Sequence, residues 1–204
     1  MKNKFGKFMV LGLFLMIFLV ACNATEAGRI EAYYIGDGGF IVSKKSENFV
    51  PGDLIMATNK TDHSGLSFGQ NYSILVADEL YSTTPPSFSI KSISEDLGKF
   101  EYLNMSFVRA GSILGLYGSE SITVDLRPKE DYDQGHVPDA INLSLDDIQA
   151  GEDFSDLLRK DQLIFVYGKG QAMSRDGAKA LVSQGYKLVF DLGDIKAYAH
   201  KLEQ

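Results

Sequence analysis

The sequence predicts a fold in two parts: a small all-β unit, followed by an α/β unit with a parallel sheet covered on both faces. Residues 27–97 contain five or six short apolar runs separated by turn-forming clusters, which is typical of a small barrel or sandwich. From about residue 100, apolar runs alternate with segments of helical spacing, which favours a parallel sheet flanked by helices. Hydrophobic residues make up 45% of the chain and charged residues 23%, as expected of a folded globular protein.

Residues 1–21 are predicted to be a signal peptide and not part of the fold. Three lysines precede the apolar stretch 8–20, which is shorter than the roughly 20 residues of a membrane span. The stretch ends in Leu-Val-Ala-Cys, which resembles the lipobox of bacterial lipoproteins. The resemblance implies diacylglyceryl attachment to Cys22 and cleavage before it. The alternative is a signal anchor with an incidental cysteine.

The cysteine count and the charge restrict the location and the partners. Cys22 is the only cysteine, so no intrachain disulfide is possible. A lipid on Cys22 would anchor the protein to the outer face of the cell membrane, and the lysine-rich start favours a Gram-positive source. Removal of the signal leaves 17 basic and 27 acidic residues, a formal charge of −10. That charge argues against nucleic acid and against simple attraction to anionic lipid head groups.

The predicted β domain spans residues 22–98 together with the lipidated N-terminus. A glycine-rich turn, "GDGG", joins the first two strands, and "VPGD", "TNKTDHSG" and "STTPP" separate the others. The specific prediction is an OB-like barrel. His63, in one of the polar loops, is expected to be exposed to solvent. The expected strands are residues 29–35, 40–43, 53–58, 71–77 and 87–93.

The second predicted domain spans residues 99–204. Its expected strands are residues 122–126, 140–144, 162–168 and 187–192. Its expected helices are residues 105–118, 128–135, parts of 145–160, 174–186 and a final helix over 194–203.

This second domain resembles a rhodanese domain over roughly residues 100–204. The stretch "VDLRPKEDYDQGHVPDAINLSL" resembles the family's Asp-x-Arg and Gly-His-(Ile/Val)-Pro-x-Ala-x-Asn pattern, and "DLGDIKAYA" resembles its closing motif. Asp194 and Tyr198 depart from the Gly and Trp that are usual there. The residues that match are Asp125, Arg127, Tyr132, Gly135, His136, Val137, Pro138, Ala140, Asn142, Gly193, Ile195 and Ala197.

The resemblance places Gly168 where active members carry the catalytic cysteine. Sulfur transfer runs through a persulfide on that cysteine, and glycine has no side chain to form one. The chain is therefore predicted to be no enzyme and to have no catalytic residue. The implied six-residue loop comprises Gly168, Lys169, Gly170, Gln171, Ala172 and Met173, with Ser174 opening and capping the next helix.

The loop still carries features of an anion site. Backbone N–H groups facing a helix N-terminus attract anions, and Lys169 and Arg175 would add positive charge. The alternative is a retained turn that binds nothing. No cofactor and no metal are expected, because the three histidines show no ligand spacing.

The remaining motif residues are expected to be structural. Asp125 and Arg127 are expected to form a buried ion pair that positions the loops, and His136 to hydrogen-bond within its turn. The functional prediction is a cell-surface lipoprotein whose inactive rhodanese-like domain binds an envelope protein partner or a small anion. The alternatives are a thiosulfate sulfurtransferase-type enzyme and a purely structural envelope module.

Overall fold

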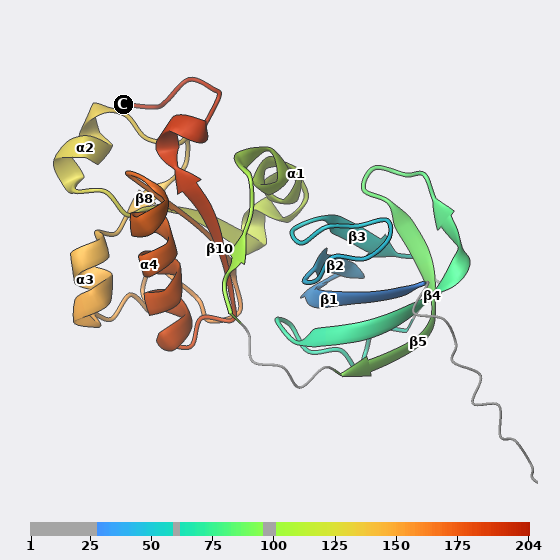
Figure 1. The fold of residues 1–204 in the computed structure, drawn as a ribbon. Coiled ribbons are helices and arrows are strands. Elements are labelled where there is room, and N and C mark those ends of the chain that lie inside the picture. Colours follow the sequence, from blue (N-terminus) through green and yellow to red (C-terminus); the bar gives the residue numbers. More distant parts are fainter. Residues whose placement is uncertain (1–27, 59–61, 96–100) are drawn as a thin grey trace, which may run out of the picture.

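The computed structural model describes residues 28–58, 62–95 and 101–204. The predicted signal peptide and Cys22 lie outside these residues. The described chain forms a β-barrel followed by an α/β domain, with helix α1 (Phe107–Tyr117) lying between them (Figure 1). Within this part of the chain, no helix is both long and apolar enough to cross a bilayer.

The N-terminal domain is a closed five-stranded barrel. Neighbouring strands follow the order β1-β2-β3-β5-β4, and β4 pairs back to β1. The β3–β5 pair is parallel, whereas the other pairs are antiparallel. This barrel is consistent with the predicted OB-like domain. Its strands are β1 (Arg29–Gly36), β2 (Gly39–Val42), β3 (Leu54–Ala57), β4 (Asn71–Tyr81) and β5 (Ser87–Glu95).

Strands β1 to β3 are apolar on both faces. Alternate residues such as Ile30, Phe40 and Ile55 point into the barrel and form its own core with Phe88. The residues between them also carry large apolar side chains, including Tyr33. These strands therefore have a second apolar face, which must be covered from outside the barrel.

The C-terminal domain is built on a five-stranded parallel sheet with the order β6-β10-β9-β7-β8. Helices α3 and α4 cover one face of this sheet (Figure 1). Its strands are β6 (Leu103–Asn104), β7 (Ser121–Asp125), β8 (Ile141–Asn142), β9 (Leu163–Gly168) and β10 (Leu188–Asp194). Its other elements are α2 (Lys129–Gln134), α3 (Leu145–Ala150), α4 (Gln171–Ser183) and the 3-10 turns η1 (Gly118–Glu120) and η2 (Ile195–Ala197).

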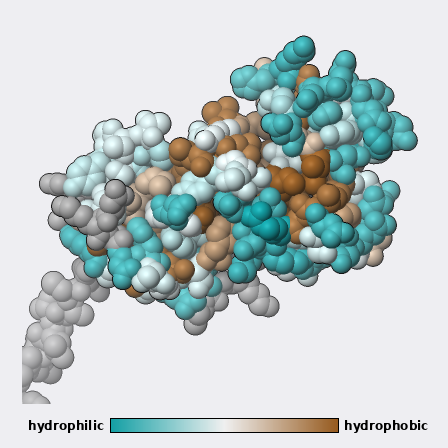
Figure 2. All heavy atoms as spheres, turned by 180° about the vertical axis from the view of Figure 1, so that it is seen from behind, coloured by the Kyte–Doolittle hydropathy of each residue, from teal (hydrophilic) through white to brown (hydrophobic). Residues whose placement is uncertain are grey.

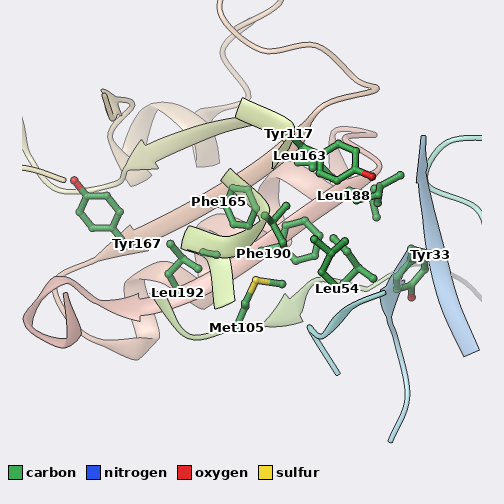
Figure 3. Close-up of a cluster of buried hydrophobic side chains, with 14 of the residues drawn as sticks. Tyr33, Leu54, Met105, Tyr117, Leu163, Phe165, Tyr167, Leu188, Phe190 and Leu192 are labelled. Atoms are coloured by element: carbon green, nitrogen blue, oxygen red, sulfur yellow. The ribbon is translucent and has the colours of Figure 1, made fainter. Parts of the chain in front are cut away.

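The opposite face of the sheet is covered by α1 and by the barrel itself. Figure 3 shows Tyr33 and Leu54 of the barrel in the same apolar cluster as Phe190 of the sheet. Tyr117 of α1 reaches the barrel, where its hydroxyl donates to the carbonyl of Gly36 at 3.4 Å. One apolar cluster therefore contains residues of both domains, in addition to the cluster that each domain has of its own.

Four further details differ from the expected elements. The final helix over 194–203 is only the turn η2, because Tyr198 packs edge-on against Phe107 and Glu203 pairs with the backbone of His136. Helix α4 begins at Gln171, three residues earlier than expected. Only residues 145–150 of the segment 145–160 are helical, and strand β6 was not predicted.

His63 is half-buried and not exposed. Its ring stacks at 6.2 Å on Tyr34, and its Nε2 atom is buried without a hydrogen-bond partner among the described residues. The His63 ring packs against Tyr34 of the barrel, a contact that the polar sequence around His63 did not indicate.

Candidate functional site

The candidate site lies at the carboxyl ends of the parallel strands, where open α/β sheets bind ligands. Only Lys169 and Gly170 separate strand β9 from helix α4. Gly170 adopts a φ of +93°, which favours glycine, and occupies the N-cap position. The six-residue loop expected from the sequence is therefore wrong, because residues 171–173 already form the first turn of the helix.

Met173 fills the space in front of Gly168. A Cβ atom on residue 168 would lie 2.7 Å from Met173 Cγ and 2.8 Å from Met173 Sδ, closer than carbon and sulfur atoms pack. The backbone N–H of Lys169 donates to the same sulfur atom at 3.4 Å. The methionine thioether thus occupies the position where a side chain on residue 168, or a ligand bound to this amide, would lie.

The two cations expected to attract an anion are each beside a carboxylate. Lys169 Nζ lies 3.4 Å from Asp131 Oδ2, and Arg175 Nε lies 3.3 Å from Asp176 Oδ1. Ser174 is fully buried, and its hydroxyl donates to the carbonyl of Gln171 at 3.2 Å. It therefore lies inside the first turn and does not cap the helix as expected.

A buried carboxylate next to the loop was missed from the sequence. Asp191 on β10 is 1% exposed and accepts hydrogen bonds from Gln171 Nε2 at 2.6 Å and from the backbone N–H of Gly193 at 2.8 Å. These bonds fix the start of α4 against the neighbouring strand. The signal was an aspartate inside the apolar run "KLVFDL", because a buried charge in a strand requires partners.

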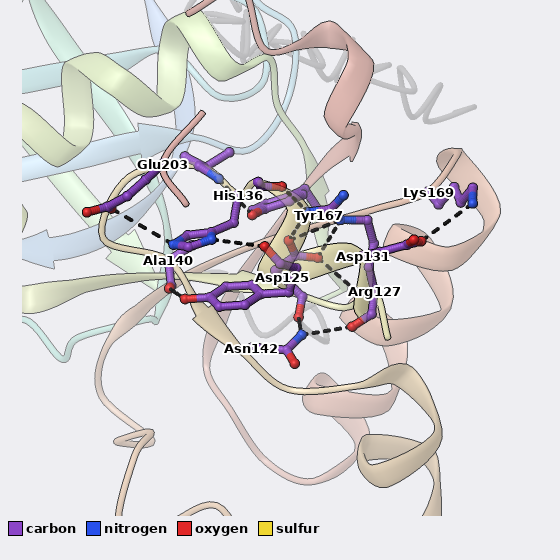
Figure 4. A network of polar contacts seen from close by, with 12 residues as sticks. Asp125, Arg127, Asp131, His136, Ala140, Asn142, Tyr167, Lys169 and Glu203 are labelled. Carbon is purple, nitrogen blue, oxygen red and sulfur yellow. Dashed lines mark hydrogen bonds and ion pairs between the residues drawn. The ribbon is translucent and has the colours of Figure 1, made fainter. Parts of the chain in front are cut away.

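The second motif forms the polar network of Figure 4 around a buried ion pair. The Asp125 carboxylate is fully buried and lies 2.6 Å from Arg127 Nη2, which also donates to the carbonyl of Gly135 at 2.7 Å. Burial lowers the pKa of the Arg127 guanidinium, but the hydrogen bond and charge of Asp125 outweigh it and raise the pKa above its ordinary value. Asn142 Nδ2 donates to the carbonyls of both Asp125 and Arg127.

Aromatic residues complete this network. His136 stacks on Tyr132 with ring centroids 3.8 Å apart, and His136 Nδ1 lies 3.1 Å from the Tyr132 carbonyl. The hydroxyl of Tyr167 accepts from the backbone N–H of Val137 at 3.0 Å, and burial raises the pKa of this hydroxyl well above its ordinary value. Pro138 lies in the exposed turn that follows. These contacts hold backbone segments of the second domain together.

The site contains few groups suited to chemistry. The described residues include no cysteine, so they provide no thiolate nucleophile. Among the described residues, no three His, Cys, Asp or Glu side chains are grouped to hold a metal ion. The carboxylates near the loop accept hydrogen bonds from Arg127, Gln171 and Lys169.

The family comparison agrees with this architecture. Residues 113–201 match the family model described as "Rhodanese-like domain". The second domain of this chain is rhodanese-like. The family of this domain includes sulfurtransferases. No curated protein sequence matches the chain.

Solved structures of rhodanese-like domains are similar to the same part of the chain. A domain of an Anabaena protein is 25% identical, with a TM-score of 0.36, and the match covers 41% of this chain and 98% of that one. A solution structure of the rhodanese-like domain from an Anabaena protein is 24% identical, with a TM-score of 0.43 and coverages of 49% and 77%. An Escherichia coli rhodanese solved with anions is 26% identical, with a TM-score of 0.37 and coverages of 41% and 98%.

Proposed function

We propose that this protein is a lipid-anchored binding protein of the bacterial envelope whose rhodanese-like domain no longer transfers sulfur. The observation that carries the proposal is the pairing of Gly168 with Met173. The resemblance in sequence implies that Gly168 stands where active members carry the thiol, and the Met173 side chain fills the space in front of Gly168. A persulfide has no atom to form on and no room to occupy.

A protein partner fits the loop better than a small anion. The N–H of Lys169 is directed at a thioether, and Lys169 and Arg175 both have carboxylate neighbours. An anion would have to displace Met173 and compete with Asp131 and Asp176. The turn between β9 and α4 is present, but each of its two nearby cations already lies next to a carboxylate.

Exposed apolar surface supports a protein partner. Val108 is 81% exposed and Leu116 is 59% exposed, and both lie on the outer face of α1. The residues between them on that face are uncharged: Ser112 and Gly115. Figure 2 shows apolar surface gathered in the middle of one face of the molecule. Surface of this kind is commonly covered by another protein.

The location rests on the sequence around Cys22, which lies outside the described residues. The lipobox-like tetrapeptide and the short apolar stretch before it support a lipid anchor on the outer face of the membrane. The rhodanese-like domain would then face the cell exterior or wall.

Sulfur transfer from thiosulfate to cyanide tests the loss of activity. A chain that begins at residue 23, and so lacks Cys22, contains no cysteine, and we expect it to give no turnover above the buffer blank. Gly168→Cys alone should stay close to the blank because its side chain meets Met173. Gly168→Cys combined with Met173→Ala should be the most active of the three proteins.

Ser183→Cys is the matched control, since it places an exposed thiol at the far end of the same helix. It should give no turnover. Turnover by the cysteine-free chain from residue 23 that survives repurification would refute the proposal. A thermal shift with thiosulfate that disappears in Lys169→Ala would instead favour a small anion as the ligand.

A further inference from the structure

One end of the barrel carries a groove, here called the anchor-end groove, with a volume of about 430 Å³. Its floor is apolar and consists of Ile30, Phe49 and Val76, which are 3%, 8% and 7% exposed. The groove is therefore shaped by well-packed side chains of the barrel and its adjoining loop. Its rim is charged.

The rim of the groove gathers basic side chains in a chain that is otherwise acidic. Arg29, Lys44 and Lys45 line it together with the acidic Glu31 and Glu47. Lys44 Nζ lies 3.0 Å from Glu31 Oε1, but the lysine side chain remains 70% exposed. Lys45 is exposed and has no ion pair within the described residues. Positive charge thus outnumbers negative charge on this rim, whereas the mature chain as a whole carries a formal charge of −10.

The groove lies where the chain enters the barrel at the start of strand β1. Gly28 lines the groove, and strand β1 begins beside it. The other end of β1 is Gly36, whose carbonyl meets Tyr117 of α1. Eight residues of strand span about 25 Å, so the groove and this contact with α1 lie at opposite ends of strand β1.

The proposed lipid anchor would place this end of the barrel against the membrane, and the inference rests on that part of the proposed function. Six steps of the chain separate Cys22 from Gly28. Fully extended, they reach at most about 20 Å. The groove cannot leave the vicinity of the lipid head groups, because the chain enters the barrel at its rim.

We infer that the anchor-end groove binds the head group of an anionic phospholipid in the membrane that holds the protein. A phosphate diester matches the exposed ammonium groups of Lys44 and Lys45, and the apolar floor can contact the glycerol carbons. The acidic chain as a whole is not attracted to such a membrane, but the groove is a local exception. A tether this short gives a high effective concentration of head groups, so a site of low intrinsic affinity is sufficient.

Lysine reactivity on vesicles tests this site. The mature chain is coupled through the thiol of Cys22 to a maleimide lipid, which reproduces the tether length without bacterial lipidation. A neutral amine-acylating reagent then reports the accessibility of each lysine by mass spectrometry. On vesicles containing phosphatidylglycerol, acylation of Lys44 and Lys45 should be slowed about threefold relative to phosphatidylcholine vesicles, and 0.5 M salt should remove the difference.

The internal controls are Lys129 and Lys169, whose side chains are 72% and 69% exposed and thus match Lys44 at 70%. Their reactivity should be the same on both vesicles. Lys45→Glu should restore the reactivity of Lys44, whereas Lys179→Glu, an equal charge change in the other domain, should not.

Three results would overturn the inference: equal slowing on both vesicle types, slowing of Lys129 or Lys169 in place of Lys44, or slowing by inorganic phosphate without vesicles. Failure of natural lipidation is a separate question, because the chemical tether replaces the lipid. It is answered by the mass of the mature N-terminus in cells.

Discussion

Replacing Gly168 by cysteine should destabilise the protein, and removal of the Met173 side chain should relieve that effect. The new Cβ would lie 2.7 Å from Met173 Cγ, whereas such atoms normally approach to about 3.5–4.0 Å. The methionine must therefore retreat by about 1 Å and lose its hydrogen bond from the N–H of Lys169. Overpacking of this kind costs about 1–3 kcal/mol of unfolding free energy.

In the Met173→Ala protein, Gly168→Cys should have the opposite effect on the unfolding free energy. Gly168 does not have a positive φ, so its backbone accepts any residue. Replacing glycine at such a position stabilises by about 0.4–1 kcal/mol, because the unfolded chain becomes less flexible. Gly168→Cys should therefore be neutral or stabilising in the Met173→Ala protein. The expected coupling energy between the two positions is about 1–3 kcal/mol.

Urea denaturation followed by circular dichroism gives the unfolding free energy of the unchanged protein, the two single variants and the double variant. The slope m should be the same for all four, which shows that they unfold by the same reaction. If Gly168→Cys costs the same free energy with and without Met173, the methionine does not fill the space in front of residue 168. Packing of Met173 could then no longer be part of the explanation for the loss of sulfur transfer.

Three further predictions concern the shared core and the anchor. Burial, with Asp37 and Tyr34 nearby, raises the pKa of Tyr117 to about 12, so the folded protein keeps a proton that the unfolded chain releases above about pH 10. Stability should fall by about 2 kcal/mol between pH 10 and 12, and less in Tyr117→Phe, as measured by urea midpoints. Leu54→Ala should cost about 2–4 kcal/mol and lower the stability of both domains in one transition, whereas the half-exposed Leu157→Ala should cost under about 0.5 kcal/mol; two separate transitions would contradict the shared core. Cys22→Ala should release the protein from the membrane fraction, and retention with an uncleaved signal would indicate a signal anchor.

The strands and most helices could be predicted because their patterns are local. The barrel strands are short apolar runs between turn clusters, and the sheet strands β9 and β10 are buried runs that alternate with helical segments. The ion pair of Asp125 with Arg127 also follows from the sequence, because it lies within one motif.

The remaining features depend on contacts between distant segments. The segment 194–203 has helical composition, but its Tyr198 packs on Phe107 and its Glu203 pairs with His136. Helix α4 begins early because Gln171 bonds to Asp191 on the neighbouring strand. The position of Met173 opposite Gly168 also requires the helix start, which the expected six-residue loop had placed too late.

The apolar cluster between the barrel and the sheet limits which substitutions the two domains can accept during evolution. Tyr33, Ile41 and Leu54 of the barrel pack in one cluster with Ile113 and Phe190 of the second domain. Neither domain can be exchanged for a homologue by recombination near residue 98 without exposing or overfilling that cluster. Substitutions on the two sides should consequently be inherited in compensating pairs, and the barrel and the rhodanese-like domain should diverge together as a single unit.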